Sequence, residues 1–326
     1  MKVLVTGATG FIGSVLTREL LKQGHQVRAL VLPSENSKAL EELGVEIRRG
    51  DLARRETLQG ICDGVDTVFH LAGRVTDWGT REQFYIAIYD ATQHLIEEAS
   101  GKASRFVYIS SIAAIGFGRH LKGMKESDQA MKSGIPYNDA KLDAEKLVMS
   151  YHASGHIACT IIRPANVTGP GSLWVRDIVE KMKSMPMPLV DHGRHSSSLI
   201  YVDNLVDGII LAGTKDIAKG KIYQLRDDWD VTWAQYISDL GALIGKKPVG
   251  SVPYWPARVL GTLLDLVFTP LKIRPPVSRM AIEITGRNND VDNSLAKQEL
   301  GWKTTIPYPE AIKRIGAWVR QTYPQR

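Results

Sequence analysis

Two residues in one short stretch, Tyr137 and Lys141 in "IPYNDAKLDAEKL" (135–147), have the types and spacing needed for proton transfer. They are four positions apart, so a helix places them one turn from each other on the same face. A phenol with its ordinary pKa of about 10 is a poor base at neutral pH, but a nearby ammonium stabilises the phenolate. Such a tyrosine can take a proton from an alcohol or return one to a ketone. The alternative interpretation is structural, a tyrosine packed on a lysine stem.

A glycine-rich turn near the N-terminus is the second feature with chemical meaning. In "VLVTGATGFIGSVL", Gly7, Gly10 and Gly13 lie between a strand-like run and a helix-like run. Glycines allow a tight turn, close approach of a phosphate to the backbone, and close packing of helix on strand. The free N–H groups and positive dipole end of the helix then favour a pyrophosphate. The turn therefore predicts binding of a dinucleotide.

The elements that must position these residues alternate along the first half of the chain. Short apolar runs predict strands at 2–6, 26–32, 45–50, 66–72, 105–110 and 158–163. Helices are predicted at 11–23, 83–100 and 137–150. Alternating strands and helices favour parallel pairing with right-handed crossovers, and near-continuous apolar runs fit strands covered on both faces. The fold class is therefore α/β, a doubly wound parallel sheet of the Rossmann type.

The rhythm of strands and helices breaks after "RPANVTGPG" (163–171), where Pro, Gly and Trp become frequent. We expect a dinucleotide-binding domain over 1–165 and a smaller, C-terminal substrate-binding lobe over 166–326. A strand at 198–202 is expected to return to the main sheet, and a helix to follow it up to residue 213.

The spacing G-x-x-G-x-x-G resembles that of the extended short-chain dehydrogenase/reductase family, within the NAD-dependent epimerase/dehydratase superfamily. Further motifs resemble this family in the right order along the chain: "GDL" (50–52), "HLAG" (70–73), "YISS" (108–111), "YNDAK" (137–141), "RPANVTGPG" (163–171) and "DNSLAKQELGWK" (292–303). One departure lies in "YIAIYDAT" (85–92), where Ile88 and Ala91 stand in place of the family's Asn and Gly.

This resemblance implies a set of site residues. It implies that Tyr137 is the acid/base, that Lys141 stabilises its phenolate and bonds the nicotinamide ribose, and that Ser111 holds the substrate oxygen. His70 is either a neighbour of the cofactor or a structural residue at a strand end. The resemblance also implies a homodimer through the helices at 83–100 and 137–150. The implied cofactor-binding residues are Gly7, Thr9, Gly10, Phe11, Ile12, Gly13, Asp51, Leu52, Leu71, Ala72, Gly73, Tyr137, Lys141 and Pro164.

The expected cofactor is NAD(P)(H), and the end of the second strand bears on the choice between its two forms. An acidic residue there would bond the ribose 2′-OH and select NAD. The aligned positions are Val31 and Leu32, so no carboxylate repels a 2′-phosphate, and Ser34 or Lys38 is in range to bind one. The sequence therefore favours NADP.

The segment 252–276, "VPYWPARVLGTLLDLVFTPLKIRPP", bears on the substrate. Arg258, Gly261, Thr262 and Asp265 recur at helical spacing as one narrow polar stripe, and the remaining surface is apolar. Such a helix is either buried between lobes, or an apolar wall for the substrate, or a contact with a membrane surface through 252–273. The pattern resembles the 3β-hydroxysteroid dehydrogenase-like branch, which implies interconversion of a secondary alcohol and ketone on an apolar, sterol-like substrate.

Three other functions stay open. In a sugar-nucleotide epimerase or dehydratase, Arg194 and Arg287 would bind the diphosphate. A carbonyl reductase similar to dihydroflavonol reductases is the second alternative, and a non-catalytic dinucleotide-binding protein is the third.

Composition narrows the class further. A 326-residue chain with 44% hydrophobic and 23% charged residues is typical of a soluble globular protein. The net charge of +6 comes from scattered residues, which argues against nucleic-acid binding. The two cysteines, Cys62 and Cys159, lack metal-site spacing and favour a reducing compartment. We therefore expect no metal site and no secretory signal. We expect a cytoplasmic protein, and the apolar surface of segment 252–273 adds the expectation of peripheral contact with a membrane.

Overall fold

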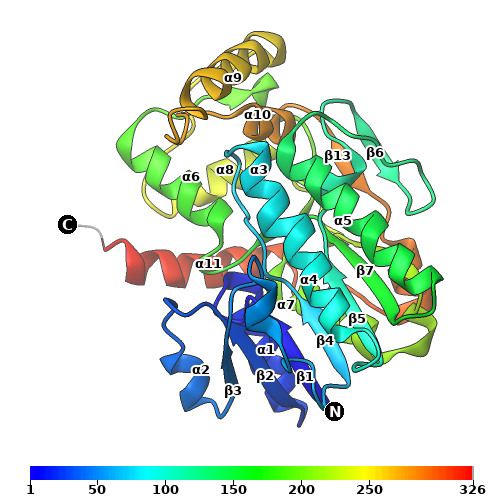
Figure 1. The fold of residues 1–326 in the computed structure, drawn as a ribbon. Coiled ribbons are helices and arrows are strands. Elements are labelled where there is room, and N and C mark those ends of the chain that lie inside the picture. The colour runs from blue at the N-terminus through cyan, green and yellow to red at the C-terminus, as the bar shows by residue number, and fades with distance from the viewer. Residues whose placement is uncertain (325–326) are drawn as a thin grey trace.

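The computed structural model describes residues 1–324 and is built on one seven-stranded sheet in which every strand pair is parallel (Figure 1). The strand order is β11-β7-β5-β4-β1-β2-β3, so the direction of winding reverses between β1 and β4. This doubly wound sheet confirms the predicted fold class. Its strands are β1 (Lys2–Thr6), β2 (Gln26–Val31), β3 (Glu46–Arg49), β4 (Thr67–His70), β5 (Arg105–Ile109), β7 (Ala158–Pro164) and β11 (Lys221–Leu225).

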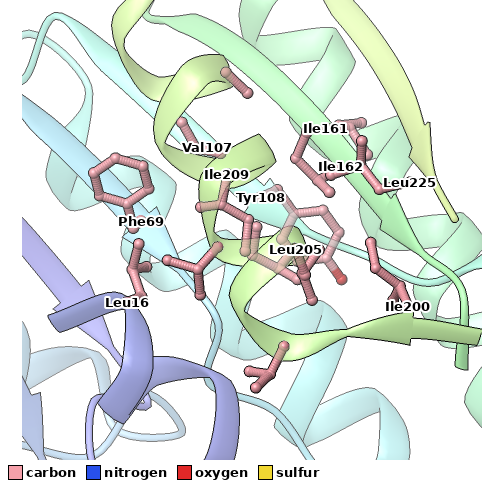
Figure 2. Packing of buried hydrophobic residues seen from close by; sticks show 14 of the residues in the cluster. Leu16, Phe69, Val107, Tyr108, Ile161, Ile162, Ile200, Leu205, Ile209 and Leu225 are labelled. Carbon is pink, nitrogen blue, oxygen red and sulfur yellow. The ribbon is translucent and has the colours of Figure 1, made fainter. Parts of the chain in front are cut away.

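Helices cover both faces of this sheet, as adjacent residues of β4 demonstrate. Phe69 contacts Gly213 of α7 (Val202–Thr214), so closely that a Cβ at Gly213 would collide with the ring. His70 hydrogen-bonds to Thr92 of α4 (Ala91–Ala99). Because successive side chains of a strand point to opposite faces, α7 and α4 lie on opposite sides. Figure 2 shows the core on the α7 side, where Leu205 and Ile209 lie beside residues of β5 and β7.

The helices that carry predicted site residues begin and end close to the expected positions. The first is α1 (Phe11–Lys22), and α5 (Pro136–Ala153) starts at a proline, which suits a first helical position. The predicted helix at 83–100 starts earlier, at Arg81, because Thr80 and Gln83 form a capping box. It consists of α3 (Arg81–Tyr85), a π-helical turn over Ile86–Asp90, and α4. The π-helical turn spans the segment in which the sequence departs from the family pattern.

The strand predicted at 198–202 does not return to the main sheet, so that expectation is wrong. The observed strand, β10 (Leu199–Tyr201), pairs in parallel with β8 (Asn166–Thr168) in a separate two-stranded sheet. The seventh position is taken by β11, which pairs with β7 along its whole length. Both segments are short and apolar, so sequence pattern alone did not distinguish them. The helix predicted after 202 does join the main layer as α7, which packs on β5 and β7.

The remaining elements form small sheets and helices beyond the carboxyl ends of the main strands, with α9 and α10 at the top of Figure 1. The division of the chain near residue 165 stays a prediction. None of the helices in residues 1–324 is both long and apolar enough to cross a membrane. The short helix α2 (Lys38–Glu42) instead lies beside β3, at the bottom of Figure 1. The other elements are β6 (Leu121–Met124), α6 (Leu173–Ser184), β9 (Leu189–Val190), α8 (Trp233–Ala242), β12 (Ser251–Val252), α9 (Tyr254–Phe268), α10 (Arg279–Thr285), β13 (Asn289–Val291) and α11 (Tyr308–Thr322).

Candidate active site

A cavity of about 1120 Å³ opens where the main strands end, and all of the residues predicted to be catalytic or to bind the cofactor through the family resemblance line it. This is the edge at which open α/β sheets bind ligands. The volume exceeds the roughly 300–1,000 Å³ of ordinary small-molecule pockets, so there is room for a dinucleotide together with a second molecule. The predicted residues on its wall are Gly7, Thr9, Gly10, Phe11, Ile12, Gly13, Asp51, Leu52, Leu71, Ala72, Gly73, Ser111, Tyr137, Lys141 and Pro164.

The glycine turn has the geometry that a bound pyrophosphate requires. Gly7 has a φ of +70°, and an added Cβ would lie 3.0 Å from the backbone nitrogen of Ala72. An added Cβ at Gly13 would collide with the carbonyl oxygen of Gly7. Helix α1 has no side-chain cap and no acidic residue in its first turn, so its N-terminal N–H groups face the cavity unopposed. This cradle fits a dinucleotide.

A buried hydrogen-bond chain holds the next part of the wall, and it identifies His70 as a structural residue. The Thr6 hydroxyl accepts the N–H groups of Leu71 and Ala72 at 3.2 and 3.1 Å, and lies 2.8 Å from His70 Nδ1. With its acceptor positions used, Thr6 donates to Nδ1, so Nε2 carries the proton and donates to Thr92 Oγ1 at 3.0 Å. Complete burial lowers the pKa of His70 to about 3, so the ring stays neutral. His70 fixes the cavity wall and does not itself line it.

Ser111, Tyr137 and Lys141 meet at the inner end of the cavity. The Tyr137 hydroxyl faces the Ser111 side chain, which acts to lower the pKa of the phenol, and the Tyr137 ring is 5.9 Å from the Phe84 ring in an edge-on arrangement. Lys141 Nζ donates to the carbonyl oxygen of Ile109 at 2.8 Å. The neighbouring Ser110 hydroxyl is buried and has no hydrogen-bond partner in the described residues. The structure thus brings the three predicted catalytic residues together.

Burial sets the ionisation of this group. The sequence predicts that the Lys141 ammonium lowers the pKa of Tyr137, but burial has the larger effect and raises it to about 12, against the opposing effect of the Ser111 hydrogen bond. Burial also lowers the pKa of Lys141 to about 8, with the Glu145 charge opposing this. At neutral pH, Tyr137 therefore carries its proton and Lys141 is mostly an ammonium. The protonated phenol is the form that can donate to a ketone oxygen.

The opposite end of the cavity contains a carboxylate that the sequence did not indicate. Glu35 lines this end, and its carboxylate accepts from the Thr9 hydroxyl at 3.1 Å and from the backbone N–H of Leu32 at 3.2 Å. Neither Ser34 nor Lys38 lines the cavity. Glu35 lies in the loop after β2. The expectation from the sequence rested only on an acidic residue at the end of this strand, at Val31 and Leu32, and therefore missed it. Asp51, at the same end, accepts from the backbone N–H of Ala53 at 2.9 Å.

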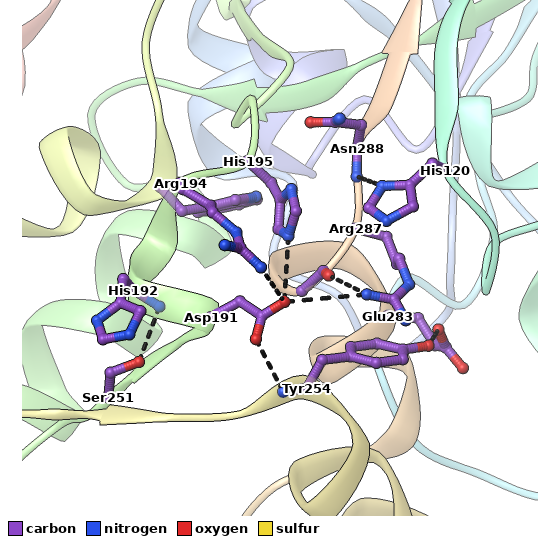
Figure 3. A network of polar contacts seen from close by, with 12 residues as sticks. His120, Asp191, His192, Arg194, His195, Ser251, Tyr254, Glu283, Arg287 and Asn288 are labelled. Carbon is purple, nitrogen blue, oxygen red and sulfur yellow. Dashed lines mark hydrogen bonds and ion pairs between the residues drawn. The ribbon is translucent and has the colours of Figure 1, made fainter.

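Arg194 and Arg287, the residues predicted to bind a diphosphate, do not line the cavity. Both point to Asp191, at 3.2 and 4.0 Å, as Figure 3 shows. Arg287 also lies over the Tyr254 ring, with its guanidinium carbon 3.2 Å from the ring centre. The two arginines therefore stabilise the contact between the loop at Asp191 and Tyr254, the first residue of α9.

Helix α9 packs through its polar stripe and exposes its apolar faces. Arg258 is bonded to the buried Glu283 at 2.8 Å, Asp265 accepts the backbone N–H of Arg279 at 3.0 Å, and Gly261 contacts the same backbone. The expectation that this helix is buried between lobes is wrong. Its outward-facing residues are Trp255, Val259, Leu260, Leu263, Leu266 and Val267, each more than half exposed.

The described residues, 1–324, contain no cluster of three or more His, Cys, Asp or Glu side chains placed to hold a metal ion.

Comparison with known proteins agrees with this geometry. The model of the NAD dependent epimerase/dehydratase family matches residues 3–225. The chain is 28% identical, over 97% of its length and 96% of the relative, to a 4-hydroxy-2-methyl-3-oxo-4-farnesyl-3,4-dihydroquinoline-1-oxide ketoreductase of Stigmatella aurantiaca. It is 27% identical, over 96% of its length and 89% of the relative, to a decarboxylating sterol-4-alpha-carboxylate 3-dehydrogenase of Mus musculus. The crystal structure of gox2253 is similar with a TM-score of 0.82, 25% identity and 99% coverage of both chains.

Proposed function

The chain belongs to the NAD-dependent epimerase/dehydratase family, and on this premise we propose that it interconverts a secondary alcohol and a ketone on an apolar substrate. The observation that carries the proposal is the meeting of Ser111, Tyr137 and Lys141 at the end of a cavity large enough for two molecules. A bound NAD(P) supplies a hydride or accepts one at this end. The enzyme is thus an oxidoreductase, and the substrate and the role of Tyr137 are the proposed parts.

In this proposal each of the three side chains has one task. Tyr137, protonated at neutral pH, donates its proton to the ketone oxygen in reduction and takes it back in oxidation. Ser111, which faces the Tyr137 hydroxyl, holds the same substrate oxygen. Lys141, anchored on the Ile109 carbonyl, keeps a positive charge near the phenol and stabilises any negative charge that develops there.

An apolar substrate is supported by the other wall of the cavity. Two relatives bear names that describe a farnesyl-bearing ketone and a sterol carboxylate, each with a large apolar part. The sugar-nucleotide alternative is weaker, because Arg194 and Arg287 are paired with Asp191 away from the cavity. The apolar and aromatic residues on this wall include Leu173, Trp174, Met187, Leu189, Trp233, Leu260, Val277, Met280 and Ile282.

The position of Glu35 revises the choice of cofactor from NADP to NAD. A carboxylate next to the glycine turn can accept a ribose hydroxyl and repels a 2′-phosphate. Arg49, which contacts this loop, has its guanidinium bonded to the carbonyls of Leu32, Pro33 and Glu35 and to the Ser37 hydroxyl, and it does not line the cavity. Among the described residues that line this end of the cavity, from Thr6 to Ala53, none is a Lys or Arg.

Replacing Tyr137 by Phe tests the proposed function. We expect turnover to fall by roughly three orders of magnitude, within the range of general acid–base catalysis, while the dissociation constant for NADH changes less than about threefold. Reduced-cofactor absorbance and product identity should be followed together, with hydroxysteroids, long-chain 3-hydroxy acids and esters, and sugar nucleotides as substrates. Tyr151→Phe, on the same helix but away from the cavity, is the matched control.

Retained turnover in Tyr137→Phe would disprove the assignment of the acid/base. A sugar nucleotide that changes configuration without net change in cofactor would establish an epimerase instead. Cofactor binding without turnover of any substrate class would favour a non-catalytic dinucleotide-binding protein.

Two features of assembly belong to the same proposal. Helices α3, α4 and α5, which pack together, are the proposed surface of a homodimer. The exposed apolar faces of α9 are the proposed contact with a membrane surface, and Leu260, which is on this helix, also lines the cavity. An apolar substrate would then enter the cavity from the lipid side.

A further inference from the structure

Arg74, directly after the cofactor-facing segment 71–73, is a charged residue of the cavity wall for which the proposed chemistry has no use. Among residues 1–324 its side chain forms no ion pair and no hydrogen bond, and its Nε is buried without a partner. A guanidinium has five N–H donors in a planar fork that matches a carboxylate. A buried donor without a partner in a native cavity calls for a ligand or water. We infer that Arg74 binds a carboxylate carried by the substrate, close to the reacting carbon.

The surroundings of Arg74 hold the guanidinium without neutralising it. Its guanidinium carbon lies 5.5 Å from the centre of the Trp78 ring and 5.7 Å from that of Phe84. Gly79 closes the third side, since a Cβ there would lie 3.2 Å from Arg74 Nε. Aromatic faces attract a cation but leave its N–H groups available. The side chain is therefore positioned before any ligand arrives, which reduces the entropy cost of binding.

Arg74 and Tyr137 share Phe84 as a neighbour, which places the guanidinium on the part of the wall next to the proposed proton donor. The Phe84 ring lies against Arg74 on one side and 5.9 Å from the Tyr137 ring on the other. One aromatic ring thus separates the guanidinium from the proton donor. A carboxylate near the carbinol carbon, as in a 3-hydroxy acid and its 3-oxo counterpart, is therefore the acid function that we assign to Arg74.

The other charged groups at this end of the cavity explain why Arg74 stays unpaired. The nearby carboxylate Asp77 is bonded to Arg274 at 3.0 Å and to the Ser278 hydroxyl at 2.9 Å, and Asp177 is paired with the same arginine. Both acidic groups on this part of the wall are therefore satisfied by Arg274. The cationic charge of Arg74 is left for a ligand.

This inference rests on the proposed function, since it names an acidic group on the substrate of the same site. The test is therefore a binding measurement that needs no turnover. The affinity of the NADH complex for 3-hydroxydodecanoate and for its methyl ester is measured by calorimetry, because neither can transfer hydride to a reduced cofactor. The variants are Arg74→Gln, Arg74→Lys and, as control, Arg81→Gln, an arginine that lies over the Tyr85 ring outside the cavity.

We expect the unmodified protein to bind the acid at least roughly tenfold more tightly than the ester, as for a hydrogen-bonded charged pair. Arg74→Gln should remove this preference and leave ester affinity within about twofold, which also shows that the variant is folded. Arg74→Lys should restore part of it, because the charge remains but the fork is lost. Arg81→Gln should behave like the unmodified protein.

Equal affinities for acid and ester in the unmodified protein would overturn the inference, as would a loss of both in Arg74→Gln. A weaker NADH affinity in Arg74→Gln, with acid preference intact, would assign the guanidinium to the cofactor phosphates instead. An acid preference that depends on Arg74 in a protein without turnover supports the inference and contradicts the proposed function. Turnover of neutral ketones by a protein that shows no preference for the acid supports the proposed function and contradicts the inference about Arg74.

Discussion

The two ends of the cavity are built in different ways. We call the end at the glycine turn and Glu35 the nucleotide end, and the end that includes Arg74 and the apolar wall the substrate end. At the nucleotide end, backbone groups and glycines form the wall, with Gly7 and Gly13 in contact with neighbouring backbone and the Thr6–His70 pair holding the next segment. At the substrate end, side chains form the wall. Ion pairs between segments far apart in the chain, such as those of Arg274 with Asp77 and Asp177, determine which charged groups there stay unpaired.

This difference follows from what each end has to bind. A dinucleotide is the same molecule throughout the family, so backbone geometry within one turn is enough to hold it. A substrate differs from enzyme to enzyme, and selectivity comes from the shape and charge of side chains at the wall. A change at the nucleotide end should therefore affect all reactions of the enzyme, whereas a change at the substrate end should affect the choice of substrate.

Of the changes that test this difference between the two ends, Gly13→Ala is expected to have the largest effect on ligand binding. The new Cβ collides with the Gly7 carbonyl, so α1 must move away from the turn. We expect NADH affinity to fall roughly 100-fold or more, together with a lower melting temperature, as overpacking at a rigid backbone contact predicts. Calorimetric titration with NADH measures the first effect and thermal unfolding the second.

Ser14→Ala, the next position on α1, adds no bulk and serves as the control. If Gly13→Ala bound NADH normally, the nucleotide end would not depend on backbone packing, and the contrast between the two ends would be lost.

A smaller effect is expected at Glu35, the carboxylate that accepts from Thr9 beside the glycine turn. The unmodified protein should bind NAD at least roughly tenfold more tightly than NADP, because the carboxylate repels the 2′-phosphate. Glu35→Ser should bring the two dissociation constants to within about threefold of each other. Fluorescence titrations with both reduced cofactors measure this ratio.

Glu42→Gln, on the exposed face of α2 and outside the cavity, is the matched control for loss of one negative charge. Tighter binding of NADP by the unmodified protein would contradict the role given to Glu35. It would support the preference for NADP that Val31 and Leu32 indicate in the sequence.

The smallest effect on stability is expected at the outer face of α9. The double change of Leu263 and Leu266 to Ser removes apolar surface that already faces solvent, so the free energy of unfolding should change by less than about 0.5 kcal/mol per site. Ile282→Ala, in the buried layer beneath this helix, should cost about 2–5 kcal/mol. Denaturant unfolding of the three proteins measures both.

The same double variant tests the proposed membrane contact. Its sedimentation with vesicles of phosphatidylcholine and phosphatidylglycerol should be weaker than that of the unmodified protein. A double variant that unfolds much more easily would show instead that this face is covered in solution by a second copy.

The sequence by itself determined most of the sheet, the glycine turn and the pairing of Tyr137 with Lys141 on one helix, because each of these depends on short-range spacing. Gly7, Gly10 and Gly13 act within one turn, and Tyr137 and Lys141 within one turn of a helix, so their spacing already implies their geometry. The order of motifs along the chain then fixed which strand ends meet at the cavity. Even there, the seventh strand was predicted at 198–202 and found at 221–225, since the choice depends on pairing with distant β7.

Only the tertiary structure decided the charges at the two ends and the orientation of α9. Glu35 reaches the nucleotide end from a loop, and Arg74 stays unpaired because Arg274, two hundred residues away, takes the nearby carboxylates. The polar stripe of α9 faces inward because Glu283 and the Arg279 backbone supply its partners. Pairing between residues far apart in the chain leaves no periodic signal in the sequence, and it is this pairing that sets what the cavity can bind.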